Sequence, residues 1–223
     1  MLKALLLAVA VATVPATELS PEAGALVAPV HEAIAKTRAE LDALPPPKDD
    51  AERLVRMRRL DQAPRKVVVT LDFSKLPAAQ RAAAQNAVAH EIMAIDAENE
   101  KTLLAMLPPE GWFSISRYGP QASTAAFLIV QHSDAALRRR FVPIMESLAA
   151  KGEVAKGEYA LMYDRLALEE GRPQRYGSQM TCKDGRLVLD ATEDPEHLDA
   201  RRAAMDLPPE KDNLAIFAAY PPC

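Results

Sequence analysis

The chain is poor in the residues that several common functional motifs require. It holds 8 glycines, 2 cysteines, 4 histidines and 1 tryptophan among 223 residues. So few glycines leave little room for loops that cradle phosphates, and no P-loop or dinucleotide-binding fingerprint occurs. His90-Glu91 begins like a zinc-protease helix, but Ala94 stands where the second histidine would be needed. The histidines and cysteines lack zinc spacing, so we predict no metal site, and the sequence identifies no cofactor.

An excess of positive charge is also missing. Lys and Arg total 27 against 31 for Asp and Glu, which gives a net charge of −4. Because nucleic-acid binding depends on a basic surface, we predict no nucleic-acid partner. The basic run Arg138–Arg140 is expected to lie on a solvated helix face. With 49% hydrophobic and 26% charged residues, the chain can bury the core of a folded domain.

The N-terminus has the pattern of a secretory signal peptide. Lys3 precedes an apolar run over 4–14, and Pro15-Ala16 follows. The run is too short to span a bilayer, although an uncleaved anchor is the alternative. We therefore expect residues 1–16 to be removed and the protein to be periplasmic or secreted, with no later membrane span. Export would permit a disulfide between Cys182 and Cys223, but two unpaired thiols are an equal alternative.

Apolar residues recur at helical spacing along most of the chain, which predicts a mainly α, compact helical domain. The second helix is expected to end near Ala63, since proline disfavours helix in the residue before it, and 67–73 is β-prone. Pro45–Pro47 separates an N-terminal helix and joint (17–47) from a helical domain over 48–223. Expected helices cover about 20–44, 50–63, 77–107, 122–132, 134–152 and 156–170, with two short ones after 194, and the 122–132 helix is expected to be central and buried.

One small antiparallel β-hairpin is predicted near the C-terminus, at about 174–190. Asp184-Gly185 suits a two-residue type I′ turn, and the flanking residues are β-prone. That turn pairs Cys182 with Leu187 and Met180 with Leu189. These four side chains share one side of the hairpin, which we expect to face the core.

Polar residues interrupt the apolar stripes of several expected helices. Buried charges are costly unless they are paired and hydrogen-bonded, so inward polar groups from separate helices are expected to meet. The result is either a structural network that fixes how the helices pack or a polar pocket. The residues are Asp61, Asp96, Asn99, Gln131, His132, Asp164 and Arg165.

The same residues fall within a set of motifs that resembles a bacterial domain-of-unknown-function family. The resemblance covers about 52–220, and that family has no assigned activity, so it implies no reaction. Ser178 stands where the family motif usually has threonine, and residues 66–79 resemble an insertion relative to the family pattern. The motifs, in chain order, are DQ-x-x-R (Asp61, Gln62, Arg65), D-x-x-N (Asp96, Asn99), GW (Gly111, Trp112), QH(A/S)D (Gln131–Asp134), YA-x-x-x-DR (Tyr159–Arg165), QRYG(T/S)Q (Gln174–Gln179) and D-x-RR (Asp199–Arg202).

Three hypotheses of function follow from these observations. In the first, the protein is an exported hydrolase or lyase with His132 as general acid or base, since the ordinary pKa of histidine suits that role. Asp164 or Asp96 would orient His132, and Arg65 or Arg165 would hold an anionic or polar group of the substrate. The proposed ligand-binding residues are Asp61, Gln62, Arg65, Asp96, Asn99, Gln131, Arg165, Gln174, Tyr176 and Gln179.

The other two hypotheses involve no chemistry. In one, the same pocket binds a small polar ligand or peptide, with Trp112 and Tyr176 as stacking surfaces. In the other, the protein is a structural or partner-binding envelope protein whose first helix serves as a docking arm. That helix could equally pack back on the body.

Overall fold

The computed structural model describes residues 18–222 and confirms a mainly α fold with one antiparallel hairpin. The predicted signal peptide therefore lies outside the described residues. Among residues 18–222, no helix combines the length and apolar character needed to cross a bilayer. The helices are α1 (Pro21–Asp42), α2 (Asp50–Val68), α3 (Ala78–Ala105), α4 (Ile115–Tyr118), α5 (Pro120–His132), α6 (Ala135–Ala149), α7 (Lys156–Glu169), α8 (Leu198–Ala204) and α9 (Glu210–Ala218). The strands are β1 (Met180–Lys183) and β2 (Arg186–Leu189).

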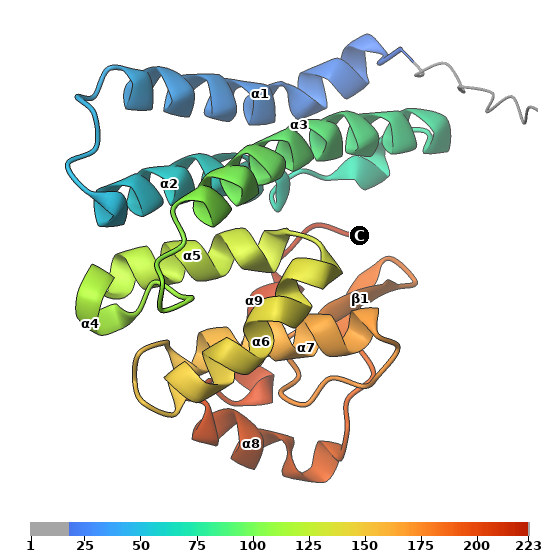
Figure 1. Ribbon diagram of the computed structural model, residues 1–223. Helices are drawn as coiled ribbons and strands as arrows, with labels where there is room; N and C mark the ends of the chain where they lie inside the picture. Colours follow the sequence, from blue (N-terminus) through green and yellow to red (C-terminus); the bar gives the residue numbers. More distant parts are fainter. Residues whose placement is uncertain (1–17, 223) are drawn as a thin grey trace, which may run out of the picture.

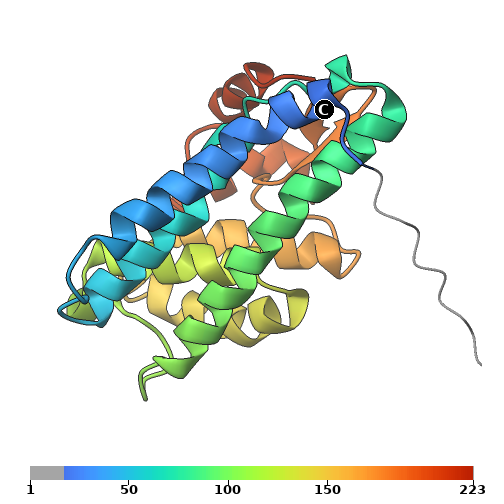
Figure 2. The ribbon, with the colours of Figure 1, turned by 90° about the horizontal axis from the view of Figure 1, so that it is seen from above.

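The first three helices form a layer on one side of α5, and α6, α7 and α8 lie on the other side (Figure 1). Helix α1 begins at the Ser20 N-cap, whose hydroxyl accepts a hydrogen bond from the Ala23 N–H, with Pro21 in the first turn. Its buried Val27 and Val30 pack in a small core with residues of α3. Figure 2 shows α1 and α3 running along the same side of the molecule. The first helix is therefore packed on the body rather than extended as an arm.

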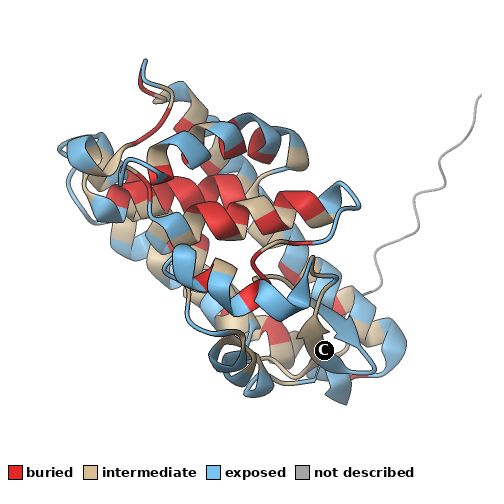
Figure 3. Cartoon of the chain, turned by 90° about the horizontal axis from the view of Figure 1, so that it is seen from below, coloured by how far each residue is buried: buried red, intermediate tan, exposed pale blue. Residues whose placement is uncertain are grey.

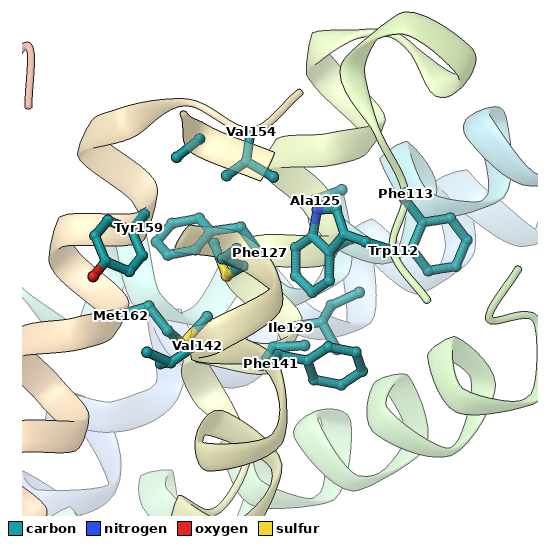
Figure 4. Close-up of a cluster of buried hydrophobic side chains, with 14 of the residues drawn as sticks. Trp112, Phe113, Ala125, Phe127, Ile129, Phe141, Val142, Val154, Tyr159 and Met162 are labelled. Carbon is teal, nitrogen blue, oxygen red and sulfur yellow. The ribbon is translucent and has the colours of Figure 1, made fainter. Parts of the chain in front are cut away.

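Helix α5 occupies the centre of the fold, as its sequence predicted. From Ala125 to Val130 every residue but Leu128 is buried, and Figure 3 shows the buried residues concentrated in the middle of the molecule. Trp112 packs against Phe141, with the ring centroids 5.2 Å apart (Figure 4). Since Trp112 is only 1% exposed, the hypothesis that it stacks on a ligand is wrong, and it anchors the core.

Two boundaries near Pro64 differ from the sequence prediction. Helix α2 continues through Pro64 to Val68, and Pro64 itself is buried. A proline removes one backbone donor and strains the turn before it. Here Arg65 donates from its guanidinium to the carbonyl oxygen of Asp61, at 2.9 Å, within that turn. The packing of the buried Pro64 overrides the local preference. The β-prone segment after Val67 finds no partner strand and forms the end of α2 and a 3₁₀ turn at Phe73–Lys75.

The hairpin has the predicted register, with Met180 opposite Leu189 and Cys182 opposite Leu187. Both turn residues adopt positive φ, 51° at Asp184 and 76° at Gly185, as a type I′ turn requires. The predicted core face is wrong, because Cys182 is exposed and its three companions are only half-buried. The strands also begin later than predicted, at residue 180 rather than 174. Pairing of Cys182 with Cys223 concerns a residue outside the described part of the chain.

Candidate functional site

The centre of the candidate site is a contact between a histidine and a buried aspartate. His132 is the last residue of α5, and α2 packs against α5 so that Asp61 faces it. Nδ1 of His132 lies 2.8 Å from Oδ1 of Asp61. Asp61 is 0% exposed, while the side chain of His132 is 14% exposed. The carboxylate in contact with His132 is thus Asp61, and not Asp96 or Asp164 as the sequence suggested.

Arg65 ties this aspartate to a second one on α3. Its NH1 donates to Oδ1 of Asp61 at 2.9 Å, and its NH2 donates to both oxygens of Asp96 at 2.8 Å. Gln62 donates to Oδ2 of Asp61 at 2.6 Å. Burial raises the pKa of Asp96 above its ordinary value, although Arg65 opposes that effect. We call Asp61, Gln62, Arg65, Asp96 and His132 the Asp61 cluster.

The Asp61 cluster also contains the donor types of a metal site. Ligand atoms of Asp61, Asp96 and His132 lie within 4.8 Å of one another. Sequence spacing did not indicate this arrangement, because each ligand comes from a different helix. Arg65 already bonds both carboxylates, so a cation bound between them would compete with the guanidinium. The residues alone therefore do not make a metal centre the favoured interpretation.

A cavity of about 390 Å³ adjoins the cluster. His132, Gln131 and Arg165 contribute to its wall, together with Ser178 and Gln179 from the segment after α7. The remaining lining is apolar and consists of Phe127, Leu128, Leu161, Met180, Leu187 and Phe217. The site therefore combines polar groups from α5 and α7 with an apolar surface, an arrangement common in small-molecule pockets.

Asp164 belongs to a second polar arrangement. Its buried carboxylate accepts hydrogen bonds from the backbone N–H groups of Arg175, Tyr176 and Ser178, at 2.7 to 3.0 Å. Burial raises the pKa of Asp164, and these N–H groups oppose that effect. We call residues 174–179 the Asp164 loop. Gly177, with φ of +61°, allows the chain to turn there.

Side chains within the Asp164 loop hold its own backbone. Gln174 is buried, donates to the carbonyl oxygens of Gln179 and Asp190, and accepts from the Gln179 N–H. Tyr176 is 5% exposed and packs edge-on against Tyr163, with the centroids 5.8 Å apart. Its burial rules out the predicted stacking on a ligand. Of the predicted loop residues, Gln179 lines the cavity and Gln174 and Tyr176 do not.

Two predicted site residues are buried without a complete set of partners. The Nδ2 of Asn99 and the Oε1 of Gln131 have no hydrogen-bond partner among the described residues. Asn99 lies one turn beyond Asp96 on α3, and Gln131 lies directly before His132 at the cavity. An unpaired buried amide is unfavourable unless a ligand or water completes it. The Gln131 amide is therefore the better placed of the two to meet a ligand.

Two buried arginines were not predicted from the sequence. Arg138 was expected on a solvated face, but it is 5% exposed and caps the end of α5 by donating to the Gln131 carbonyl oxygen at 3.0 Å. Arg202 is 1% exposed and donates to the carbonyl oxygens of Tyr176 and Gly177 at 2.8 and 3.0 Å. The position of Arg202 in the last motif was a signal for it. Nothing in the basic run distinguished Arg138 from its neighbours.

The fold and site define a mainly helical domain with a buried carboxylate–histidine cluster beside a polar cavity. Residues 48–220 match the model of a family of unknown function (DUF6624), so the chain belongs to that family. No curated protein matches this chain, and no solved structure matches it either. The whole of the Asp61 cluster and the Asp164 loop lies within the matched residues, whereas α1 precedes them.

Proposed function

We propose that the protein is an acid/base enzyme, a hydrolase or lyase, that acts on a small polar molecule bound in the cavity beside His132. One observation carries this proposal. Asp61 engages Nδ1 of His132, and no described residue hydrogen-bonds the other ring nitrogen, while His132 lines the cavity. A histidine oriented by a buried carboxylate, with its second nitrogen free for substrate, is the usual arrangement of a general base.

Each member of the Asp61 cluster has a distinct role in this proposal. Asp61 holds the neutral ring with its proton on Nδ1 and stabilises the imidazolium that forms when Nε2 takes a proton. Arg65 and Gln62 hold the Asp61 carboxylate in place. In hydrolysis Nε2 would take the proton from water, and in elimination it would take the proton from carbon. In both cases it would return the proton to the leaving group.

The role of Asp164 differs from that of Asp61. Asp164 contacts backbone N–H groups rather than His132, so we assign it the role of a positioning residue. It holds the loop from which Ser178 and Gln179 reach the cavity.

His132→Gln is expected to lower turnover about a hundredfold, because the substitution removes the acid/base group and keeps a polar side chain. The assay screens the full chain against nitrophenyl esters, nitrophenyl phosphates and small hydroxy acids. His90→Gln is the control, since His90 is exposed on α3. Equal turnover by the His132→Gln variant and the wild type would refute the assigned role.

A spectroscopic measurement tests the same proposal without a substrate. Long-range ¹H–¹⁵N spectra of the full chain should show that neutral His132 carries its proton on Nδ1. In Asp61→Asn the carboxylate is lost, and we expect a mixture of tautomers. If neutral His132 in the wild type carries its proton on Nε2, that nitrogen cannot act as the base, and the proposal fails.

We also propose that the protein acts outside the cytoplasm, because its first residues have the pattern of a secretory signal. The intact mass of the mature protein, expressed with its native N-terminus in a bacterial host, tests this proposal. We expect the mass of a chain that begins at Thr17, which results from cleavage after Ala16. Recovery of the full chain in the cytoplasmic fraction would be the contrary result.

A further inference from the structure

Arg165 differs from Arg138 and Arg202 in how its charge is held, and it is half-buried where they are buried. Arg138 pairs with Glu169 and also donates to backbone carbonyl oxygens, and Arg202 donates to the carbonyl oxygens of the Asp164 loop and of Pro208. In the described part of the chain, no carboxylate lies within ion-pair distance of Arg165, and its buried Nε has no acceptor. Arg165 nevertheless lines the cavity beside His132.

The surroundings of Arg165 disfavour its positive charge. Burial lowers the pKa of Arg165, and the positive charges of Arg138 and Arg65 act in the same direction. Glu169 opposes this effect, but Arg138 engages its carboxylate. The cavity wall holds no carboxylate among its lining residues. Arg165 is half-buried, and a partly desolvated cation without an ion-pair partner is unfavourable, which favours an anion as its partner.

We propose that Arg165 binds the oxyanion of a small ligand, a carboxylate or a phosphate, in the cavity that adjoins His132. Guanidinium groups suit both anions because their N–H groups can donate two parallel hydrogen bonds. This inference rests on the proposed function, and it adds the substrate class to that function. It selects Arg165 over Arg65, because Arg65 is already bonded to Asp61 and Asp96.

The rest of the lining narrows the ligand further. Gln131 lies at the same wall, and its Oε1 has no hydrogen-bond partner among the described residues. It offers a donor and an acceptor to a hydroxyl or amine of the ligand. Phe127 and Leu161 provide apolar contact. The cavity therefore fits a small acid with one polar substituent and an apolar body, rather than a bare inorganic ion.

Binding of two probes to the full chain tests this proposal. Inorganic phosphate and hexanoate are titrated by calorimetry, and the Arg Nε–H resonances are followed by NMR. We expect both probes to bind the wild type and to shift the Arg165 resonance, with hexanoate bound more tightly if the physiological group is a carboxylate. Arg165→Gln should weaken binding about tenfold or more, because it removes a charge-assisted interaction, and Arg165→Lys should weaken it less.

The control variant is Arg53→Gln. Arg53 is exposed and has no ion pair in the described part of the chain, so its loss should change probe binding less than twofold. Binding of both probes to Arg165→Gln as tightly as to the wild type would overturn the proposal. The proposal would also be overturned if the wild type bound neither probe.

His132→Gln separates this proposal from the proposed function. We expect that variant to retain probe binding within about threefold while it loses turnover, because a neutral amide replaces a ring that does not itself neutralise the anion. Full turnover by His132→Gln with anion binding at Arg165 intact would refute only the acid/base role. Anion binding that is independent of Arg165, with turnover dependent on His132, would refute only the anion site.

Unfolding temperature provides a second readout on Arg165. If Arg165 only stabilised the fold, its replacement would lower the unfolding temperature. Because Arg165 is a half-buried cation without an ion-pair partner among the described residues, Arg165→Gln should instead raise the unfolding temperature by about 2–4 °C in the absence of ligand. A lower unfolding temperature would show that Arg165 stabilises the fold and would contradict an empty anion site.

Discussion

Replacing Asp61 with alanine is expected to lower the free energy of unfolding by about 3–5 kcal/mol. The carboxylate is 0% exposed and holds three side chains, His132, Arg65 and Gln62. Its removal leaves Arg65 with one carboxylate fewer and leaves the half-buried Gln62 and His132 without this partner. Breaking a buried ion pair costs far more than losing an exposed one, because the remaining charge stays desolvated.

Urea unfolding followed by circular dichroism measures this effect. Asp61→Asn should be less destabilising than Asp61→Ala, since the amide oxygen still accepts one hydrogen bond. Asp42→Ala is the control, because Asp42 is exposed at the end of α1, and a change of less than about 0.5 kcal/mol is expected there. A loss below about 1 kcal/mol for Asp61→Ala would mean that the Asp61 cluster is not a tightly coupled network.

Variants of Asp61 and His132 that fold also test the proposed chemistry. If Asp61→Asn folds but loses turnover, the carboxylate acts on His132 beyond its structural role. If both Asp61→Asn and His132→Gln fold and keep full turnover on every substrate of the panel, the cluster is a structural network. The two variants together therefore separate the alternatives that the sequence left open.

Periodicity predicted the fold better than it predicted contacts. The apolar run of α5 predicted burial on all sides, because no polar face was available to meet water, and every residue of the run except Leu128 is buried. The same argument brought Asp61, Asp96 and His132 inward from separate helices, and they meet. Helical spacing gives the direction of a side chain, so convergence on a shared interior was predictable.

Sequence spacing could not supply the partner of each group. His132 contacts Asp61 rather than Asp96 or Asp164 because of how α2 packs on α5. Similarly, α2 continues through Pro64, which is buried in the packed fold, and this tertiary packing overrides a local preference. Asp164 and Arg165 are neighbours in sequence, yet one binds a loop backbone and the other faces a cavity.

Asp164→Ala is the second substitution for which we expect a large effect, a loss of about 3–5 kcal/mol in the free energy of unfolding. The carboxylate accepts three backbone N–H groups that no other acceptor in the loop serves. Each buried donor left without an acceptor costs about 1–3 kcal/mol, and partial entry of water reduces the sum. Asp164→Asn should lower the free energy of unfolding by less than Asp164→Ala, because its amide oxygen can still accept a hydrogen bond. It should still destabilise the fold relative to the wild type, because its NH₂ group meets donors rather than acceptors.

The control for this prediction is Asp199→Ala. Asp199 is exposed and accepts one backbone N–H, from Glu210 at 2.7 Å, so its loss should cost less than about 1 kcal/mol. Urea unfolding of the three variants provides the comparison. Similar losses for Asp164→Ala and Asp199→Ala would show that the Asp164 loop finds other acceptors.

The Asp164 loop also links stability to the cavity. Ser178 and Gln179 line the cavity, and Asp164 fixes the backbone that carries Ser178. We therefore expect Asp164→Asn, where it folds, to weaken hexanoate binding without abolishing it, since Arg165 on α7 remains in place. A partial loss of hexanoate binding would show that Asp164 positions the cavity wall. Replacement of Arg165, in contrast, removes the anion-binding group itself.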